Sequence, residues 1–230
     1  MLDKSESEFK FIAMPTAIPA IPKPAGNGVH AAKQTRSQLK HLALLQAGRR
    51  HLATHDLSTL SVARLTRDAG MAVGSFYSRF ADKDAWFAEL LRVTGDAVLD
   101  DTLALLGSAR WVRASDERKV ALIVRHIVDV HRSHRGIFRA ALGDRAHAAQ
   151  FGAPVHAYGQ RIADAVHEAL ADRMRQVPAA QRRLRVGIAL QLVYGTLMNA
   201  VLRDPGPIRL GDARMERELT RVFLGTVQLG

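Results

Sequence analysis

The stretch Leu60–Trp86 constrains the fold of this 230-residue chain more than any other, because it predicts two short helices joined by a tight turn. Ser61 is placed to cap the first helix, since its hydroxyl can accept the backbone N–H groups that a helix start leaves unpaired. Gly70 can adopt the left-handed conformation that ends such a helix. A second short helix is expected over Val73–Phe80, and Asp82 is the predicted cap of a longer third helix.

The side-chain pattern of this stretch separates a supporting helix from an exposed one. The first helix has one apolar face, and the second points Phe76 and Phe80 inward while its polar side chains point outward. A small apolar helix that supports a short, polar and basic one is the layout of a helix-turn-helix. In DNA-binding proteins the second helix of this unit enters the major groove.

Composition narrows the class of protein. Apolar residues make up 47% of the chain, which excludes wholesale disorder. The absence of cysteine excludes disulfide frameworks, thiolate catalysis and cysteine-based zinc sites. The sequence shows no run near the roughly 18 apolar residues of a membrane span, and no secretory signal. We therefore expect a cytoplasmic protein without a membrane partner.

The net charge of +11 favours a polyanionic partner, here double-stranded DNA. Between Lys33 and Arg92, ten Lys and Arg residues face five acidic ones, so positive charge is densest around the predicted helix-turn-helix. The remainder of the chain is not acidic. Charge alone therefore suggests a partner class without locating its site.

The predicted architecture is all-α, with an N-terminal three-helix helix-turn-helix domain followed by a larger helical effector-binding and dimerisation domain. Four prolines and two glycines predict a flexible or polyproline-like arm over residues 1–32, with an arm that enters the minor groove of DNA as the alternative. The DNA-binding domain is expected over 33–81, with its first helix from Lys33 to His55, and the second domain over 82–230. After a long helix ending near Gly107, the periodicity predicts helices at 116–134, 136–148, 154–177, 179–203 and 212–227.

The predicted helix at 179–203 is apolar nearly all round and must be buried on several sides. It carries two stripes, one with Leu190 and Leu197 and one with Ile188 and Leu192. Burial within the monomer is one interpretation, and a homodimer seam shared with the last helix is another that can coexist with it. The residues expected in this seam are Leu190, Leu197, Val201, Leu219 and Phe223.

Ten histidines raise the question of an enzyme or a metal site. His126, His131 and His134 do not have the spacing that would place all three on one metal-binding helix face. A Gly-x-Ser-x-Gly elbow and a phosphate-binding glycine loop are also missing from the sequence. We therefore expect no catalysis, no metal and no cofactor. The second domain could instead enclose an effector cavity, with plain core packing as the alternative for each candidate: Trp111, His126, Phe138, Phe151, Tyr158 and Tyr194.

The run Ser61–Trp86 resembles the TetR-like (tetracycline-repressor-like) transcriptional regulators. The matching positions follow that family's pattern without gaps: Ser61, Val62, Leu65, Ala69, Gly70, Gly74, Ser75, Phe76, Tyr77, Phe80, Lys83 and Asp84. Ala72 departs from the pattern by replacing a usual serine, and Val73 stands where a polar residue is common. Gly48 likewise occupies a position where alanine is usual, and Asp56 one where glycine is usual.

This resemblance implies a homodimer whose two N-terminal domains enter successive major grooves of a palindromic operator. It also implies a repressor that leaves DNA when a small-molecule effector of unknown identity binds the second domain. The DNA-binding residues would divide into phosphate contacts (Ser61, Tyr77, Lys83), a point of close backbone approach (Gly74) and contacts to base edges (Ser75, Ser78, Arg79). Ordinary solvated surface remains the alternative for the two serines, and a phosphate contact for Arg79.

Two other functions are compatible with the sequence. One is a helical ligand-binding or interaction protein whose DNA binding is weak or non-specific. The other is DNA packaging by charge alone, which would show steep loss of binding with salt and no preferred sequence. An operator reader would instead keep a large ratio of specific to non-specific affinity.

Overall fold

The computed structural model describes the backbone of residues 29–204 and 206–229, and the side chains from Arg36 onward apart from Pro205 and Gly230. In this part of the chain every regular element is a helix. The all-α prediction is therefore confirmed. The predicted N-terminal arm falls mainly outside the described residues.

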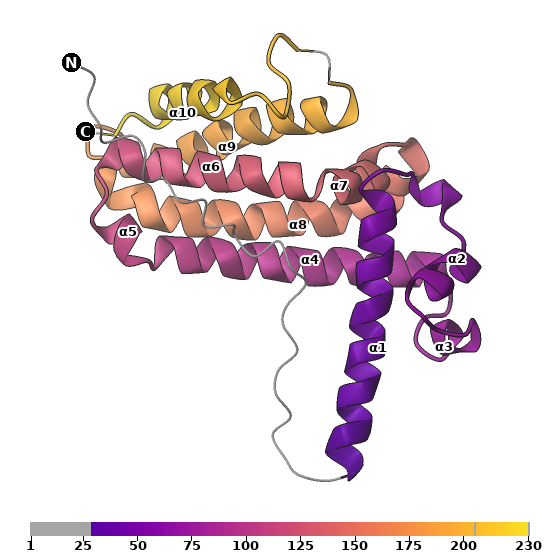
Figure 1. The fold of residues 1–230 in the computed structure, drawn as a ribbon. Helices are drawn as coiled ribbons and strands as arrows, with labels where there is room; N and C mark the ends of the chain where they lie inside the picture. Colours follow the sequence, from indigo (N-terminus) through magenta and orange to yellow (C-terminus); the bar gives the residue numbers. More distant parts are fainter. Residues whose placement is uncertain (1–28, 205, 230) are drawn as a thin grey trace, which may run out of the picture.

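Helix α1 (Val29–Leu52) projects away from the rest of the molecule, and α2 (Val62–Asp68) and α3 (Gly74–Tyr77) lie beside it (Figure 1). A 3-10 turn, η2 (Leu57–Thr59), leads from α1 to α2. These elements form the head of the molecule. The first helix starts at Val29 rather than Lys33 and ends at Leu52 rather than His55.

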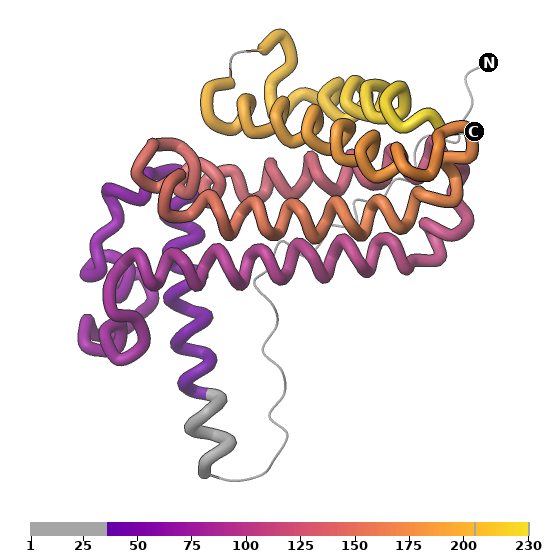
Figure 2. The backbone as a smooth tube through the Cα atoms, turned by 180° about the vertical axis from the view of Figure 1, so that it is seen from behind, coloured from indigo at the N-terminus to yellow at the C-terminus, as the bar shows by residue number. Residues whose placement is uncertain are grey.

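The remaining helices form an elongated bundle. Helix α4 (Lys83–Leu106) runs the length of the bundle and α8 (Arg145–Leu170) lies along it (Figures 1 and 2). Helix α6 (Asp116–Ser133) also belongs to the bundle, and its His126 ring lies 2.9 Å from the Thr102 hydroxyl of α4. Helices α9 (Ala179–Leu202) and α10 (Arg214–Val227) form an outer layer. Shorter elements complete the bundle: α5 (Ala109–Val112), α7 (Arg135–Leu142) and η3 (Ala171–Arg173).

The largest departure from the predicted helices concerns α8. The sequence suggested that a helix begins at Pro154, but α8 begins nine residues earlier and contains this proline in its interior. Its cap is Asp144, whose carboxylate accepts the backbone N–H of His147 at 2.9 Å. The helix is therefore capped well before the proline and tolerates it in its interior, where one backbone N–H is missing. The short helix α5 was not predicted.

The head has an apolar core that reaches well beyond its own three helices. It combines residues of α1 and α3 with Trp86, Phe87 and Leu90 at the start of α4. It also includes Ile137 of α7 and Phe151 of α8, whose ring meets Phe87 edge-on at 4.9 Å between centroids. The head is thereby packed onto one end of the bundle.

Gly48 shows how tightly this core is packed. A Cβ atom at this position would lie 2.0 and 2.2 Å from two ring carbons of the fully buried Trp86. The indole therefore occupies the space that the alanine usual at this position would fill. We expect Gly48→Ala to lower the free energy of unfolding by about 1–3 kcal/mol, because overpacking forces side chains off their rotamers.

Urea denaturation measures this effect. Gly159→Ala is the matched control, since that helical glycine in α8 has no heavy atom within 4 Å of an added Cβ. It should be neutral or slightly stabilising. An unchanged midpoint for Gly48→Ala would show that Trp86 can move aside.

The second core lies within the bundle, and it corrects the predicted dimer seam. Leu190 and Leu197 of α9 and Leu219 and Phe223 of α10 are all buried there within one subunit. Val201 is half-buried. The four-residue spacing on α10 had correctly indicated one apolar face, but α9 and not a second subunit covers it. These residues stabilise the monomer, with about 1.5–3 kcal/mol for each large side chain buried.

Candidate DNA-reading surface and effector cavity

The local signals of the helix-turn-helix act as the sequence predicts. The Ser61 hydroxyl accepts the backbone N–H of Arg64 at 3.1 Å, and Asp82 accepts that of Ala85 at 2.7 Å. Gly70 has a φ of +68°, the left-handed conformation that ends α2. Ser61 and Gly70 define the two ends of α2, and Asp82 defines the start of α4.

Helix α3 presents a mostly uncharged surface to solvent. Tyr77 is 57% exposed and Val73 is 45% exposed, while Phe76 between them is buried in the head core. Gly74 has open space where a Cβ would be, so packing within the protein does not require a glycine there. A glycine that the fold does not need is consistent with close approach of a partner's backbone.

Arg79, which the sequence suggested as a contact to a base edge or a phosphate, makes hydrogen bonds within the head. Its guanidinium donates to the Ser75 carbonyl at 2.8 Å, to the Ser78 hydroxyl at 3.0 Å and to the Ser37 hydroxyl of α1 at 3.3 Å. In this structure it connects the end of α3 to α1. To reach a base edge the side chain would have to exchange these hydrogen bonds for those of a guanine.

Lys83 and Ser78 are also engaged within the head. The Lys83 ammonium donates to the Leu57 carbonyl at 3.1 Å, which holds the start of α4 against η2. The Ser78 hydroxyl donates to the Ser75 carbonyl at 3.0 Å. Of the seven residues predicted to bind DNA, Gly74 and Tyr77 are therefore those most available to a partner.

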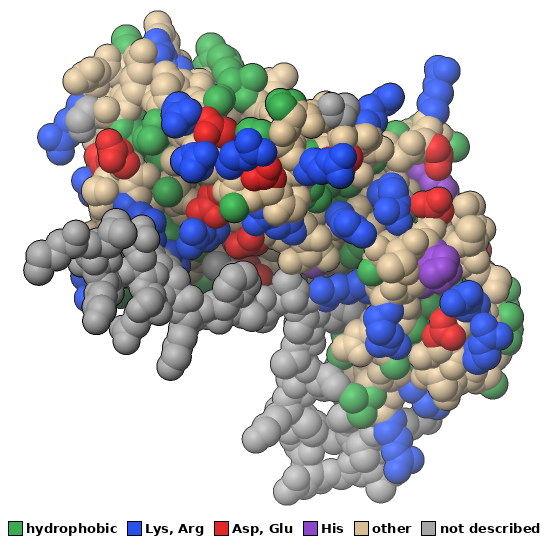
Figure 3. Space-filling model, turned by 45° about the horizontal axis from the view of Figure 1, so that its top comes forward, with side chains coloured by type: hydrophobic (Ala, Val, Ile, Leu, Met, Phe, Trp, Pro, Cys, Tyr) green, Lys and Arg blue, Asp and Glu red, His purple; other side chains and the backbone are tan. Residues whose placement is uncertain are grey.

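Basic side chains are not confined to the head. Figure 3 shows Lys and Arg spread over one face of the whole molecule, with Asp and Glu between them. Many of these basic side chains form ion pairs with acidic neighbours. Arg92, for example, lies 2.7 Å from the carboxylates of both Glu89 and Asp96. Positive charge alone therefore does not mark the DNA-reading surface, and the exposed face of α3 has to be identified from its shape.

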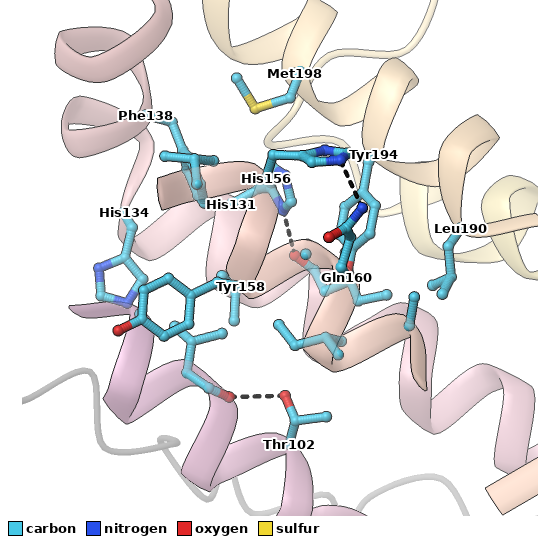
Figure 4. A pocket seen from close by; sticks show the side chains of 18 of the residues that line it. Thr102, His131, His134, Phe138, His156, Tyr158, Gln160, Leu190, Tyr194 and Met198 are labelled. Carbon is cyan, nitrogen blue, oxygen red and sulfur yellow. Dashed lines mark hydrogen bonds between the residues drawn. The ribbon is translucent and has the colours of Figure 1, made fainter. Parts of the chain in front are cut away.

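The bundle encloses a cavity of about 520 Å³ between α4, α6, α7, α8 and α9. Its lining side chains converge from all of these helices (Figure 4). Its exposed lining residues belong to α8 and α9, so its mouth lies along the seam between these two helices: Pro154, His156, Gln160, Gln191 and Gly195. A cavity of this size is in the range of pockets that hold drug-sized ligands.

Four of the six candidate effector residues line this cavity: His126, Phe138, Tyr158 and Tyr194. The other two are a correction to the prediction. Trp111 packs in the bundle core with the Lys119 ammonium 5.9 Å from its ring, and Phe151 belongs to the head core. The sequence-based prediction also omitted three lining residues, Thr102, His131 and His134. Each is a polar position on a largely apolar helix, and this pattern could have indicated them.

Burial favours the neutral form of three of the four histidines that line the cavity, His126, His131 and His134. Burial lowers the pKa of His131 to about 4, and burial with the nearby positive charge of Arg49 lowers the pKa of His134 to about 4. The pKa of His126 is lowered by burial as well. His131 Nδ1 donates to the Ile127 carbonyl at 2.8 Å, so its Nε2 carries no proton in the neutral ring.

These pKa shifts predict a pH-dependent stability. In the unfolded chain both rings protonate near pH 6.5, whereas in the folded protein they stay neutral down to about pH 4. The unfolded state therefore binds more protons in this window, and the free energy of unfolding should fall as pH is lowered from about 6.5 to 4. The loss should reach at most about 3 kcal/mol for each ring. Urea titrations at several pH values should show this slope, and His131→Asn should reduce it.

Helix α7 connects the cavity to the head. Ile137 and Phe138 line the cavity, while Gly136 lies against the end of α1, where a Cβ would be 1.9 Å from the Leu52 carbonyl oxygen. Arg139 donates to the carbonyl of Leu52 at 3.3 Å and to that of His55, in the α1–α2 connection, at 3.2 Å. Helix α7 is therefore in direct contact with both the cavity and the head.

Helix α9 has a solvent-exposed apolar stripe opposite its buried face. Leu184, Ile188 and Leu192 are 64%, 41% and 46% exposed, and Val222 of α10 beside them is 44% exposed. Among the described helices, α9 is the one whose length and composition would allow it to cross a membrane, a test that core helices of soluble proteins also pass. Here its inner side packs on α6, α8 and α10.

The residues that the structure describes contain no group of three or more His, Asp or Glu side chains placed to hold a metal ion. The histidines that the sequence brings close together are used differently. His126 contacts the Thr102 hydroxyl at 2.9 Å, and this hydroxyl donates to the Val98 carbonyl at 2.7 Å. Because the hydroxyl has one proton, His126 Nε2 is the donor between the two side chains.

The chain matches two family models. Residues 44–90 match the model described as bacterial regulatory proteins, tetR family, and residues 117–225 match the tetracyclin repressor-like C-terminal domain. Among curated proteins none matches this chain.

Several solved structures share the fold. A TetR-family transcriptional regulator from Mesorhizobium loti is 16% identical with a TM-score of 0.64, over 83% of this chain and 97% of the other. NalD of Pseudomonas aeruginosa, described as the secondary repressor of the MexAB-OprM multidrug efflux pump, is 22% identical with a TM-score of 0.60, over 84% and 98%. FadR of Bacillus subtilis, solved in complex with stearoyl-CoA, is 12% identical with a TM-score of 0.58, over 81% and 98%.

Together the two family matches extend over the head and most of the bundle, and the solved structures share the arrangement of both. The chain belongs to the TetR-like family of DNA-binding transcriptional regulators.

Proposed function

We propose that this protein is a sequence-specific repressor that binds a palindromic operator as a homodimer and is released when a small molecule fills the bundle cavity. The observation that carries the proposal is the position of α7, which forms a wall of the cavity on one side and contacts the end of α1 on the other. Ligand binding and DNA binding then depend on the same element.

The DNA side of the proposal rests on the exposed face of α3. We assign the closest approach to Gly74 and Tyr77, because neither is needed elsewhere in the fold. Ser61 lies at the start of α2 with an exposed side chain, where a phosphate could accept from the helix N-terminus. Arg79 would contribute base contacts only after leaving Ser37.

The homodimer rests on the apolar stripe of α9 with Val222 of α10. Large exposed apolar side chains in one patch are a mark of an interaction surface. A second copy packed on the same patch would form a four-helix seam and place two heads side by side. Once one head of the dimer is bound to the operator, the second head binds intramolecularly, which raises the overall affinity for DNA.

The effector step rests on the cavity and on the rigid contacts around α7. A ligand that binds more tightly when α7 is in one position than in another increases the population of molecules with α7, and the attached head, in the favoured position. The size of this shift is set by the difference between the two affinities. The FadR structure with stearoyl-CoA supports small-molecule binding by proteins of this fold. Release of DNA by the ligand is the repressor arrangement, in which the empty protein binds the operator.

The test begins with selection of binding sites from random duplexes at physiological salt. The proposal expects a palindromic consensus and an affinity at least about 1,000-fold above that for random DNA. No preferred sequence, combined with steep loss of binding with salt, would support the packaging function instead.

Two variants then locate the surface that reads the consensus. Tyr77→Ala should weaken operator binding without changing the melting temperature, because the ring is exposed and its hydroxyl is not held by the fold. Val112→Ala is the control, since Val112 is 69% exposed on α5 at the opposite end of the bundle. Equal affinities for the two variants would remove α3 from the DNA surface.

A further inference from the structure

The bundle cavity has an unusual lining for a chain rich in charge. Charged residues make up 24% of the sequence, yet none of the described residues that line the cavity is Asp, Glu, Lys or Arg. The walls are mainly aliphatic and aromatic, with a few hydroxyl, amide and imidazole groups. The neutral state of His126, His131 and His134 leaves the interior without a formal charge. The fourth lining histidine, His156, is exposed at the mouth, where its Nε2 lies 2.9 Å from the Gln160 amide nitrogen.

The cost of burying a charge then decides which ligands fit. An organic cation would meet no carboxylate in this cavity, and an organic anion would meet no ammonium or guanidinium group. Burying an ion without a partner of opposite charge costs several kcal/mol more than burying a neutral group of the same shape. A neutral ligand avoids this cost on the same apolar walls.

Two polar atoms of lining residues lack a hydrogen-bond partner among the described residues. They are the Tyr194 hydroxyl and Nδ1 of His134, and both are shielded from bulk water. Tyr194 packs against the His131 ring, with 5.9 Å between ring centroids. A buried hydroxyl without a partner costs about 1–3 kcal/mol, so a ligand that supplies an acceptor gains from its presence.

The second tyrosine of the cavity provides a contrast. The Tyr158 hydroxyl donates to the Asp96 carboxylate at 2.6 Å, and it also lies 3.1 Å from the Arg92 carbonyl. Its ring fills the space above Gly95, where a Cβ would be 2.3 Å from the ring. Tyr158 therefore offers a ligand an aromatic surface, whereas Tyr194 also offers an unused donor (Figure 4).

We infer that the cavity takes an uncharged, largely apolar molecule with one hydrogen-bonding end, such as a long-chain alcohol, ketone or ester, rather than an organic cation or anion. The inference rests on the proposed role of the cavity as the effector site. It assigns the polar end of the ligand to Tyr194 and its apolar body to the walls contributed by α4, α7 and α8.

A matched series of ligands tests the ligand class on the DNA-free protein. The cavity is first filled with the neutral fluorescent probe N-phenyl-1-naphthylamine, which is then displaced at pH 7.5 by 1-decanol, decanoate or decylammonium. These three share one alkyl chain and differ in the charge of the end group. Decanol should displace the probe at a concentration at least about tenfold lower than either ion, because only the ions lose their hydration without gaining a partner. Equal or better displacement by an ion, or no displacement by decanol, would overturn the inference.

Two variants test the assigned polar end. Tyr194→Phe should weaken decanol binding by about three- to tenfold, the effect of one neutral hydrogen bond. Thr220→Val is the control, because it removes a hydroxyl of α10 that is not part of the cavity lining and that donates to the Glu216 carbonyl at 2.7 Å, so it should leave decanol affinity unchanged. Equal effects of the two substitutions would remove Tyr194 from its assigned role.

Operator affinity measured in the presence of decanol distinguishes a failure of the ligand class from a failure of the proposed function. If decanol binds as expected but operator affinity does not change, the ligand class stands and the effector-release mechanism fails. If an ion is preferred, the ligand class fails whatever happens to DNA binding.

Discussion

Gly136→Ala is expected to displace the reading head from the bundle and to weaken operator binding by more than about tenfold. The added Cβ would lie 1.9 Å from the Leu52 carbonyl oxygen and 2.5 Å from its carbon, and both are backbone atoms. Helices α1 and α7 would have to separate by more than an ångström. We expect the free energy of unfolding to fall by about 1–3 kcal/mol as well, as in other overpacked cores.

Separation of the two helices would also break the contacts of Arg139. Its guanidinium holds the Leu52 and His55 carbonyls and the Asp56 carboxylate, at 3.1 to 3.3 Å. Urea denaturation and fluorescence anisotropy with operator DNA measure the two effects. Gly152→Ala is the control, since its added Cβ would make only an ordinary contact of 3.7 Å with Leu142. Wild-type stability and affinity in Gly136→Ala would show that α7 is not rigidly joined to the head.

Leu192→Arg is expected to convert the proposed dimer into monomers. Leu192 is 46% exposed, with Ile188 one turn before it on the same stripe of α9. Two arginines brought together across a two-fold seam would repel and would lose hydration. Operator affinity should fall by about 100-fold or more, because each head then binds alone.

Analytical ultracentrifugation gives the oligomeric state of this variant, and circular dichroism shows whether its fold is retained. Val112→Arg is the control, because it places the same charge on an exposed apolar position of another helix, α5. A dimer that persists in Leu192→Arg would place the seam elsewhere. A monomer with unchanged operator affinity would contradict the proposed mode of DNA binding.

The features that could be predicted from the sequence are those with a local cause. Ser61, Gly70 and Asp82 define helix ends through contacts with residues at most three or four positions away, and the structure places those ends accordingly. The same local reasoning failed at Pro154. A proline does not stop a helix when the cap at Asp144 and the packing of both halves stabilise it.

Choices between two apolar faces could not be predicted. Helix α9 carries one stripe that is buried and one that is exposed, and both have the same periodicity. Which stripe faces inward depends on α10, whose position follows from the whole chain. For the same reason Trp111 and Phe151 could not be told apart from the aromatics that line the cavity. The hydrogen bond of Arg79 to Ser37 could not be predicted, because the two residues lie 42 positions apart in the sequence.

The core that the head shares with α4, α7 and α8 limits how DNA-binding heads can be exchanged between proteins of this family. Cutting the chain after Ala81, at the predicted domain boundary, would remove Trp86, Phe87 and Leu90, along with Ile137 and Phe151, from the core they share with α1. A head excised there would expose the apolar surface that these residues cover. A chimera that transfers the DNA specificity of this protein to another bundle would therefore have to carry the first turns of α4, and to match the recipient's α7 and α8 to the underside of α1.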